Sequence, residues 1–247
     1  MQCNPNTTVP DKALVIDLII PALNEAKAIG LVLEAIPINL VRRIIVCDNG
    51  STDDTVRVAS SHGAVVLHEP EKGYGAACLK ALEYISNTKS EVRLPDAIGF
   101  LDADYSDFPE DLIDLTEAMQ KRNLDLVIGS RVLGDPESGS LTPIQKFGNA
   151  LSTKLIKYLF GYQFTDLGPF RLIKYDPLAR MKMADRNFGW TVEMQVKAAK
   201  MGLNCGEVPV RYRRRIGQSK VSGTIKGSFL AGKKILLTIF REKWIQE

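Results

Sequence analysis

The chain has 247 residues and a mass of 27.3 kDa, a length that suits one large domain or two small ones. Hydrophobic residues make up 45% of it and charged residues 25%, which excludes a disordered, collagen-like or disulfide-dense protein. The net charge is only +3, but residues 205–247 hold 10 Lys or Arg against 3 Asp or Glu. This basic end suits phosphates or an anionic membrane, and a solvated lysine-rich helix has the same composition.

Signals for targeting are absent from the first twelve residues, which are polar and lack the apolar core of a secretory signal. The four cysteines include no C-x-x-C pair, which indicates free thiols in a reducing compartment. No apolar run approaches the ~20 residues of a membrane span. We therefore expect a cytoplasmic protein whose contact with the cytoplasmic membrane face is peripheral, and no nucleic-acid partner.

Short apolar runs alternate with helical patterns through the first half, as in βα units around a mostly parallel sheet. The expected strands cover residues 14–20, 42–47, 64–67, 97–101 and 124–128. Helices with apolar spacing near 3.6 are expected at 26–36, 53–61, 75–86 and 109–121.

The alternation loosens after Gly134. A Gly/Pro/Ser-rich stretch at 134–143 precedes expected helices at 144–160 and 191–201, a strand at 207–212 and a last helix from about residue 224. We predict a single α/β domain, Rossmann-like, with a mostly parallel central sheet flanked by helices. Its expected limits are 13–222, between a flexible N-terminus (1–12) and a basic amphipathic C-terminal helix (223–247).

The loops that follow the strands are where such a sheet binds its ligand. The first, Pro21 to Glu25, has neither a G-x-G-x-x-G motif nor a Walker A lysine loop, which disfavours dinucleotide and P-loop functions. The second, Asp48 to Asp54, can present polar edges to a base and cap the next helix. The third, Lys72 to Gly75, can bring backbone N–H groups and a lysine to an anion. The last two also suit ordinary turns.

Two carboxylates, Asp102 and Asp104, follow the fourth expected strand. At the end of a buried strand they would face one space and repel each other unless something neutralised them. Oxygen ligands with an incomplete protein shell suit Mg²⁺ or Mn²⁺ completed by substrate phosphates. A solvated acidic turn is the alternative.

Six short motifs occur in order between about residues 18 and 220. They are Pro21 to Glu25, Asp48 to Asp54, Asp102 to Asp104, Gly129 to Arg131, Phe170-Arg171, and Arg214 through Gly217 to Lys220. Together they resemble family 2 glycosyltransferases of the GT-A fold, and within that group the dolichyl- and polyprenyl-phosphate sugar transferases. The resemblance implies a GT-A-type domain and an inverting, metal-dependent hexosyltransferase. The implied donor is a UDP- or GDP-hexose, and the favoured acceptor is a polyprenyl (dolichyl-like) phosphate.

The resemblance and the loop positions together give a set of expected site residues. Those expected around the nucleotide sugar are Pro21, Ala22, Leu23, Glu25, Asp48, Asn49, Lys72, Gly73, Asp102 and Ala103. The resemblance places the Mg²⁺ or Mn²⁺ on Asp104, with Asp102 as a second candidate ligand. It associates Arg131 with the phosphate of the acceptor, and Arg214 and Lys220 with phosphates generally.

Three positions depart from the family pattern. Asn49 stands where many relatives have a second Asp, which affects the contact to the base. Ser106 stands where relatives have a stronger metal ligand, so either Ser106 or water completes the metal shell. Where relatives often have Ser-Gly-Phe-Arg, this chain has Gly168-Pro169 before Phe170 and Arg171, so a hydroxyl that could touch the acceptor is lost.

The acceptor decides which further residues matter. A lipid phosphate is already anionic at pH 7, so it needs positioning by Arg131 more than removal of a proton. A sugar or glycolipid hydroxyl needs a general base, for which Glu193 or Asp166 is available. Each of these has a structural alternative, as an ion-pair or turn residue. A sugar-nucleotide sensor or membrane scaffold without activity is the remaining alternative.

The arginines and helices near the end of the chain carry two further expectations. Arg211, Arg213 and Arg215 are expected to form a solvated basic strand. The helices at 144–160 and 224–244 mix apolar and basic residues, a pattern typical both of interfacial helices and of helices docked on a sheet.

Overall fold

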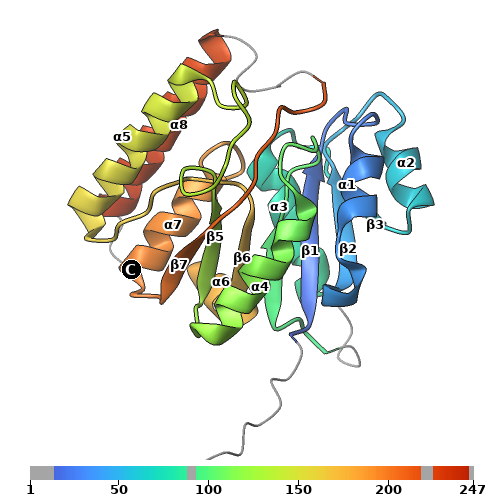
Figure 1. The fold of residues 1–247 in the computed structure, drawn as a ribbon, viewed down its shortest axis with the longest axis horizontal. Helices are drawn as coiled ribbons and strands as arrows, with labels where there is room; N and C mark the ends of the chain where they lie inside the picture. The colour runs from blue at the N-terminus through green and yellow to red at the C-terminus, as the bar shows by residue number, and fades with distance from the viewer. Residues whose placement is uncertain (1–13, 88–92, 218–224, 245–247) are drawn as a thin grey trace, which may run out of the picture.

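A seven-stranded sheet forms the centre of the computed structural model, which describes residues 14–87, 93–217 and 225–244 (Figure 1). The strand order is β3-β2-β1-β4-β6-β5-β7. The strands are β1 (Ile16–Ala22), β2 (Val41–Asp48), β3 (Val65–His68), β4 (Ala97–Phe100), β5 (Leu126–Ser130), β6 (Arg171–Lys174) and β7 (Cys205–Pro209). Neighbouring strands are parallel except β6, which runs antiparallel to β4 and β5.

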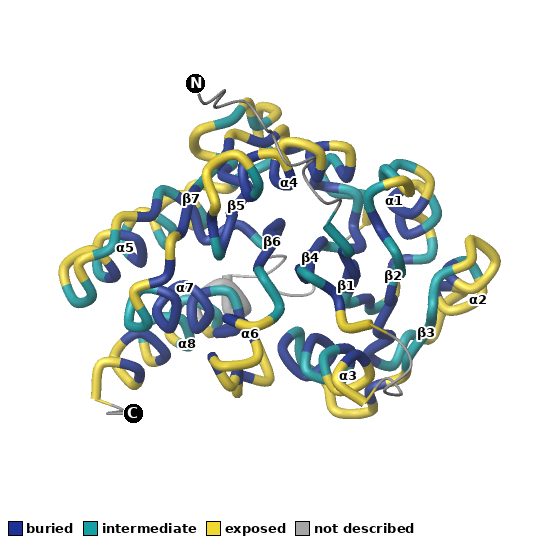
Figure 2. The backbone as a smooth tube through the Cα atoms, turned by 90° about the horizontal axis from the view of Figure 1, so that it is seen from below, coloured by how far each residue is buried: buried dark blue, intermediate teal, exposed yellow. Residues whose placement is uncertain are grey.

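Helices cover both faces of the sheet (Figure 2). On one face pack α1 (Ile29–Ala35), α2 (Thr55–Ser61) and α4 (Leu112–Lys121), the last after a 3₁₀ turn at Pro109–Asp111. On the other face pack α3 (Tyr74–Ser86), α5 (Pro143–Phe160), α6 (Tyr175–Met181), α7 (Trp190–Lys200) and α8 (Ile225–Trp244). Side chains alternate between the faces with a period of two, so Ile19 of β1 joins one core and Ile20 the other.

The predicted fold class is confirmed: the sheet is mostly parallel, helices flank it, and a C-terminal helix is present. The sequence does not predict β6 and α6, because β6 is four residues long with a cationic residue at each end. The expected strand at 207–212 is wrong in its end, since β7 stops at Pro209. Val210 N still donates to the carbonyl oxygen of Ser130 (3.2 Å), where β5 itself ends, and the chain then leaves the sheet.

The register of the sheet brings three loops to one edge. Ala22, at the end of β1, pairs with Asp48, at the end of β2. Strand β4 runs parallel to β1 on its other side and ends at Phe100. The loops after these three strands therefore open toward a common space at the carboxyl edge of the sheet.

Helices α5 and α8 lie side by side at one end of the molecule (Figure 1). The start of α5 is fixed by a capping box between Thr142 and Gln145, and its end by Gly161 in the left-handed conformation. Lys234 of α8 forms an ion pair of 2.9 Å with Asp185, in the loop before α7. Among the described residues, no helix combines the length and apolar character that crossing a membrane requires.

Candidate active site

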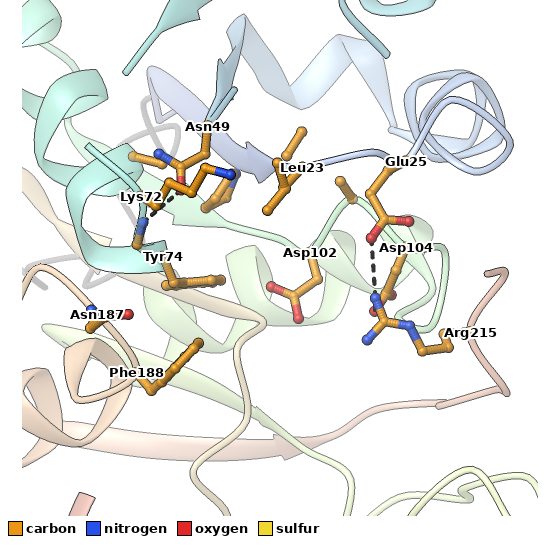
Figure 3. A pocket seen from close by; sticks show the side chains of 15 residues that line it. Leu23, Glu25, Asn49, Lys72, Tyr74, Asp102, Asp104, Asn187, Phe188 and Arg215 are labelled. Atoms are coloured by element: carbon orange, nitrogen blue, oxygen red, sulfur yellow. Dashed lines mark hydrogen bonds and ion pairs between the residues drawn. The ribbon is translucent and has the colours of Figure 1, made fainter. Parts of the chain in front are cut away.

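A cavity of about 450 Å³ opens at the carboxyl edge of β1, β2 and β4 (Figure 3). Its wall includes nearly all the residues expected around a nucleotide sugar. The lining residues are Pro21, Ala22, Leu23, Glu25, Asn49, Lys72, Gly73, Tyr74, Ala77, Asp102, Ala103, Asp104, Asn187, Phe188 and Arg215. We call this the first cavity.

The loops after β1 and β2 are bound to each other. The side-chain oxygen of Asn24 accepts a hydrogen bond from Thr52 N (2.7 Å), and Asn24 N donates to Ser51 Oγ (2.8 Å). Glu25 N donates to Thr55 Oγ1 (2.8 Å), which fixes the backbone of this buried residue at the cavity wall. These polar side chains leave the two loops as one rigid rim.

Asp48 and Asn49 have different positions. Asp48 is buried, accepts hydrogen bonds from Gly50 N and Ser51 N, and does not line the first cavity. Asn49 lines it, but its amide is engaged. Its nitrogen donates to the carbonyl oxygen of Glu71 (2.7 Å) and its oxygen accepts from Gly73 N (2.6 Å). An aspartate could not make the first of these bonds, because it has no N–H to donate.

Ser106 is engaged in holding Asp104. One carboxylate oxygen of Asp104 accepts from Ser106 N (2.9 Å) and Ser106 Oγ (2.5 Å). The other oxygen is 3.0 Å from the guanidinium of Arg215, which also lies 3.1 Å from Glu25. The aspartate is therefore fixed in orientation by its own loop, with a cation on its free side.

Asp102 is the unsatisfied member of the pair. Its Oδ1 atom is buried and has no hydrogen-bond partner among the described residues. Burial, and the nearby Asp104 carboxylate, raise its pKa to about 7. The hydroxyl of Tyr74 is buried nearby, and burial raises its pKa above the ordinary value.

The donor atoms at this edge fit a divalent cation held partly by ligand. Within the described residues, no group of three or more His, Cys, Asp or Glu side chains comes close enough for an all-protein metal site. The orphaned oxygen of Asp102 beside Asp104 is the kind of group that Mg²⁺ or Mn²⁺ would satisfy. Two carboxylates leave several coordination positions, which phosphate oxygens and water can fill.

A second cavity, of about 310 Å³, adjoins the first and shares Tyr74, Asp102, Asp104, Phe188 and Arg215 with it. Its other polar wall residues are Arg131, Gln145, Asn149, Thr191 and Tyr212. Its remaining wall, from α5, α7, α8 and the loop before β6, comprises Ile144, Gly148, Leu167, Pro169, Trp190, Ala231, Gly232 and Ile235. The second cavity thus has the two carboxylates and the guanidinium of Arg215 where it meets the first, and is mainly apolar toward α5 and α8.

Arg131 is held by a bidentate ion pair with Asp166. Its Nε and Nη2 atoms donate to the two carboxylate oxygens, each at 2.7 Å, and its backbone N donates at 2.9 Å. Burial alone would lower the pKa of Arg131, but the hydrogen bond and charge of Asp166 raise it. Asp166 is itself 1% exposed, and its backbone N donates to Glu207. The pair therefore fixes a permanent cation at the wall of the second cavity.

Four of the expected residues that the structure describes line neither cavity: Asp48 and Asp166, whose contacts are given above, and Glu193 and Arg214. Glu193 is fully buried, accepts from Ala184 N (3.0 Å) and Asp185 N (2.8 Å), and pairs with Lys197 at 2.8 Å. The exposed side chain of Arg214 donates to the carbonyl oxygen of Ser138. Lys220 lies outside the described residues.

The expected solvated strand of arginines is wrong in its strand and in Arg213 and Arg215, whereas Arg211 is exposed. Arg213 stacks on the rings of Tyr105 and Phe108, with its guanidinium carbon 3.4 and 3.8 Å from their centroids. Arg211 pairs with Asp111. Arg215 reaches both cavities. The sequence gives no periodicity that would single out Arg215, because this segment follows neither strand nor helix geometry.

Sequence reasoning also missed Asn187 and Phe188, which reach the first cavity from the loop before α7. This loop packs against the start of α3, where Ala76 N donates to the carbonyl oxygen of Arg186 at 2.9 Å. A Cβ on Gly73 would lie 2.0 Å from that oxygen, so only glycine permits the contact. A glycine before a helix was the available signal, but it does not identify the partner loop.

Comparison with known proteins gives concordant matches. Residues 17–182 match the family described as glycosyl transferase family 2. The chain is 34% identical over 218 residues to an uncharacterized glycosyltransferase of Mycobacterium tuberculosis (87% of this chain, 94% of that protein). It is 30% identical over 224 residues to an undecaprenyl-phosphate mannosyltransferase of Micrococcus luteus (85% and 88%). Its fold is similar to that of glucosyl-3-phosphoglycerate synthase from Mycobacterium tuberculosis, solved with Mn²⁺, uridine diphosphate and glucosyl-3-phosphoglycerate (TM-score 0.73, 19% identity, 95% of this chain and 81% of that chain).

The raised pKa of Asp102 predicts a specific pH dependence of stability. Between about pH 4 and 7 the folded protein keeps a proton on Asp102 that the unfolded chain has released, so the free energy of unfolding should fall as pH rises. Asp102→Asn should flatten this fall by up to ~1.4 kcal/mol per pH unit. Urea unfolding of both proteins in EDTA from pH 4 to 8 measures the difference. Parallel curves for the two proteins would contradict the assignment.

Proposed function

Since the chain belongs to glycosyl transferase family 2 and has the GT-A fold, we propose that it transfers a hexose from a nucleoside diphosphate sugar to the phosphate of a polyprenyl lipid. One observation carries this proposal. The first cavity meets the second at Asp102, Asp104 and Arg215, and the second has a further arginine, Arg131, in its wall and is mainly apolar toward α5 and α8. Such a pair suits a polar sugar donor beside an acceptor with an anionic head and a hydrocarbon chain.

The donor would occupy the first cavity. Pro21, Leu23 and Asn49 lie at the end expected to hold the nucleoside, and Lys72 is the exposed cation beside them. Asp102 and Asp104 lie at the other end, nearest the second cavity. In this arrangement the sugar would face the second cavity, with the diphosphate next to the two carboxylates. The donor we propose is a UDP- or GDP-hexose.

Asp104, with Asp102, would hold a Mg²⁺ or Mn²⁺ ion on the donor diphosphate. When bound, such a cation stabilises the negative charge that develops on the departing nucleoside diphosphate. Ser106 contributes by orienting Asp104 through two hydrogen bonds, which leaves water to complete the shell at that position. Arg215 supplies a further positive charge at the same junction.

The reaction we propose needs no general base. A phosphate oxygen of the acceptor forms a bond to the anomeric carbon, and the bond from that carbon to the diphosphate breaks with its electron pair on the leaving group. The acceptor oxygen carries no proton that must be removed, so the transfer depends on positioning and charge. Attack from the second cavity, opposite the leaving diphosphate, inverts the anomeric configuration.

The surroundings of the two expected bases support a phosphate acceptor over a hydroxyl. Glu193 reaches neither cavity and is bound to Lys197 and two backbone N–H groups. Both carboxylate oxygens of Asp166 accept hydrogen bonds from the guanidinium group of Arg131. Neither carboxylate is placed to take a proton from a sugar hydroxyl. Arg131 lines the second cavity, where it would contribute positive charge toward the acceptor phosphate while paired with Asp166.

Helices α5 and α8 would place the enzyme at the cytoplasmic face of a membrane. Each has an exposed stripe with helical spacing that mixes apolar and basic side chains. The α5 stripe comprises Phe147, Lys154 and Tyr158, and the α8 stripe comprises Leu230, Lys233, Leu237, Phe240 and Trp244. Apolar side chains of this kind enter the interfacial region of a bilayer, and the lysines attract anionic lipid. The apolar end of the second cavity lies between these same helices.

The metal role predicts the effect of Asp104→Asn. The change removes a charge at nearly constant volume, so transfer should fall about a hundredfold or more while the melting temperature changes little. Asp114→Asn, the same change at an exposed position on α4, is the matched control and should leave activity unchanged. Transfer of label from UDP- or GDP-hexose to polyprenyl phosphate, with Mn²⁺ and with EDTA, is the measurement. Full activity of the variant, or of the parent enzyme in EDTA, would contradict the metal role.

The acceptor role predicts a contrast between Arg131 and Glu193. Arg131→Lys keeps a positive charge beside Asp166 but loses the planar, bidentate guanidinium group. The acceptor KM should therefore rise about tenfold. Glu193→Gln should leave kcat within a few-fold of the parent, because no base is required. Steady-state kinetics with varied polyprenyl phosphate test both changes. An unchanged acceptor KM in Arg131→Lys, with a loss of ~10² or more in kcat for a folded Glu193→Gln, would indicate a hydroxyl acceptor.

The membrane role predicts salt-sensitive binding to anionic vesicles and little binding to neutral ones. A double change, Lys154→Gln with Lys233→Gln, removes one charge from each exposed stripe and should weaken binding about tenfold at low salt. Lys80→Gln with Lys121→Gln, on α3 and α4, is the control with equal charge and should bind as the parent does. Sedimentation with vesicles measures the bound fraction. A parent protein that stays in solution at low salt would refute the peripheral contact.

A further inference from the structure

We propose that Arg215 takes the place of the divalent cation on Asp104 in the donor-free enzyme, so that metal and nucleotide bind cooperatively. The guanidinium lies 3.0 Å from the carboxylate oxygen of Asp104 that Ser106 leaves free, and 3.1 Å from Glu25 (Figure 3). This inference rests on the proposed function, because it assumes that Asp104 receives a metal ion.

The position of Arg215 is imposed by its backbone. On one side of it, Arg213 N donates to the carbonyl oxygen of Ser106 at 2.9 Å. On the other, Ile216 N donates to the carbonyl oxygen of Asp104 at 3.0 Å. Both hydrogen bonds bind the segment to the acidic loop, so the guanidinium can leave Asp104 only by rotating its own side chain.

A metal ion and this guanidinium cannot share the free oxygen of Asp104. Both are cations, and a divalent ion within coordination distance of that oxygen would lie a few ångströms from the guanidinium. In a site where Asp104 is only 5% exposed, solvent screens such repulsion weakly. A metal ion binding alone must therefore break the Arg215–Asp104 pair, and its affinity is reduced by that cost.

A diphosphate would remove this cost. Arg215 lines both cavities, and its Nε atom is buried without a hydrogen-bond partner in the described part of the chain. The guanidinium thus has an unused donor at the place where the donor phosphates are proposed to lie. Phosphate oxygens form bidentate hydrogen bonds with guanidinium groups. These bonds would compensate Arg215 for the loss of its ion pair with Asp104. By linkage, the nucleotide then raises metal affinity and the metal raises nucleotide affinity by the same factor.

The test is Mn²⁺ binding without substrate, followed by electron paramagnetic resonance of free Mn²⁺. Arg215→Gln should bind Mn²⁺ alone at least about fivefold more tightly than the parent, the low end of usual coupling factors. Addition of UDP, or of GDP in a parallel series, should tighten Mn²⁺ binding to the parent by more than it does to the variant. Arg214→Gln removes the same charge one residue away, where the side chain faces Ser138, and should resemble the parent in Mn²⁺ affinity.

Thermal melting gives a second readout that remains usable if Arg215→Gln is weakened by its unpaired carboxylates. Mn²⁺ alone should raise the melting temperature of this variant, whereas the parent should need Mn²⁺ and nucleotide together. Arg215→Gln that binds Mn²⁺ no more tightly than Arg214→Gln, and gains no stability from it, would overturn the proposal.

The outcomes separate this inference from the proposed function. Failure of Mn²⁺ to bind the parent and Arg215→Gln, even with UDP or GDP, would overturn the metal site and the role of Arg215 with it. If Mn²⁺ binds as expected but no hexose is transferred to any lipid phosphate, the role of Arg215 is supported and the proposed lipid phosphate acceptor is refuted.

Discussion

The contact between the segment after β7 and the loop after β4 sets the geometry on which the rest of the site depends. Two backbone hydrogen bonds, from Arg213 to Ser106 and from Ile216 to Asp104, join residues about 110 positions apart in the sequence. They place Arg215 against Asp104 and divide the carboxyl edge of the sheet into two adjoining cavities. Without this contact Arg215 would not lie against Asp104 or contribute to the wall that the two cavities share.

The same junction holds more buried carboxyl groups than its neighbouring cations pair with. Asp107 is 2% exposed with no hydrogen-bond partner on either oxygen among the described residues, and burial, with Asp102 and Asp104 nearby, raises its pKa. The charge of Arg131 is engaged by Asp166. Buried carboxylates without partners cost stability, and such cost is typical of sites whose neutralising group arrives with a ligand. A cation carried by a diphosphate is a group of that kind.

How much of this was predictable differs between elements. The sheet, the strand-end loops and the Asp102-x-Asp104 pair follow from short apolar runs and from the convergence of parallel strands at one edge. The choice of Arg215 over Arg214 does not follow from the sequence. These neighbours lie in an irregular segment, where tertiary hydrogen bonds and not a period of two or 3.6 decide which one faces the cavities. For Glu193 the sequence left two alternatives, a base or an ion-pair residue, and the structure shows the ion pair with Lys197; helical spacing places Glu193 on a face of the helix but does not reveal the backbone of residue 185 beside it.

Helix α8 is part of the site wall and not an independent attachment. Its Lys234 pairs with Asp185, whose other oxygen accepts from Asn187 N (2.8 Å) in the loop that lines the first cavity. That loop contacts the start of α3 through the carbonyl of Arg186, and Arg186 pairs with Glu71, whose carbonyl accepts from Asn49. A continuous set of polar contacts therefore runs from α8 to the rim of the first cavity. Because α8 also borders the apolar end of the second cavity, displacement of this helix would alter both cavities together.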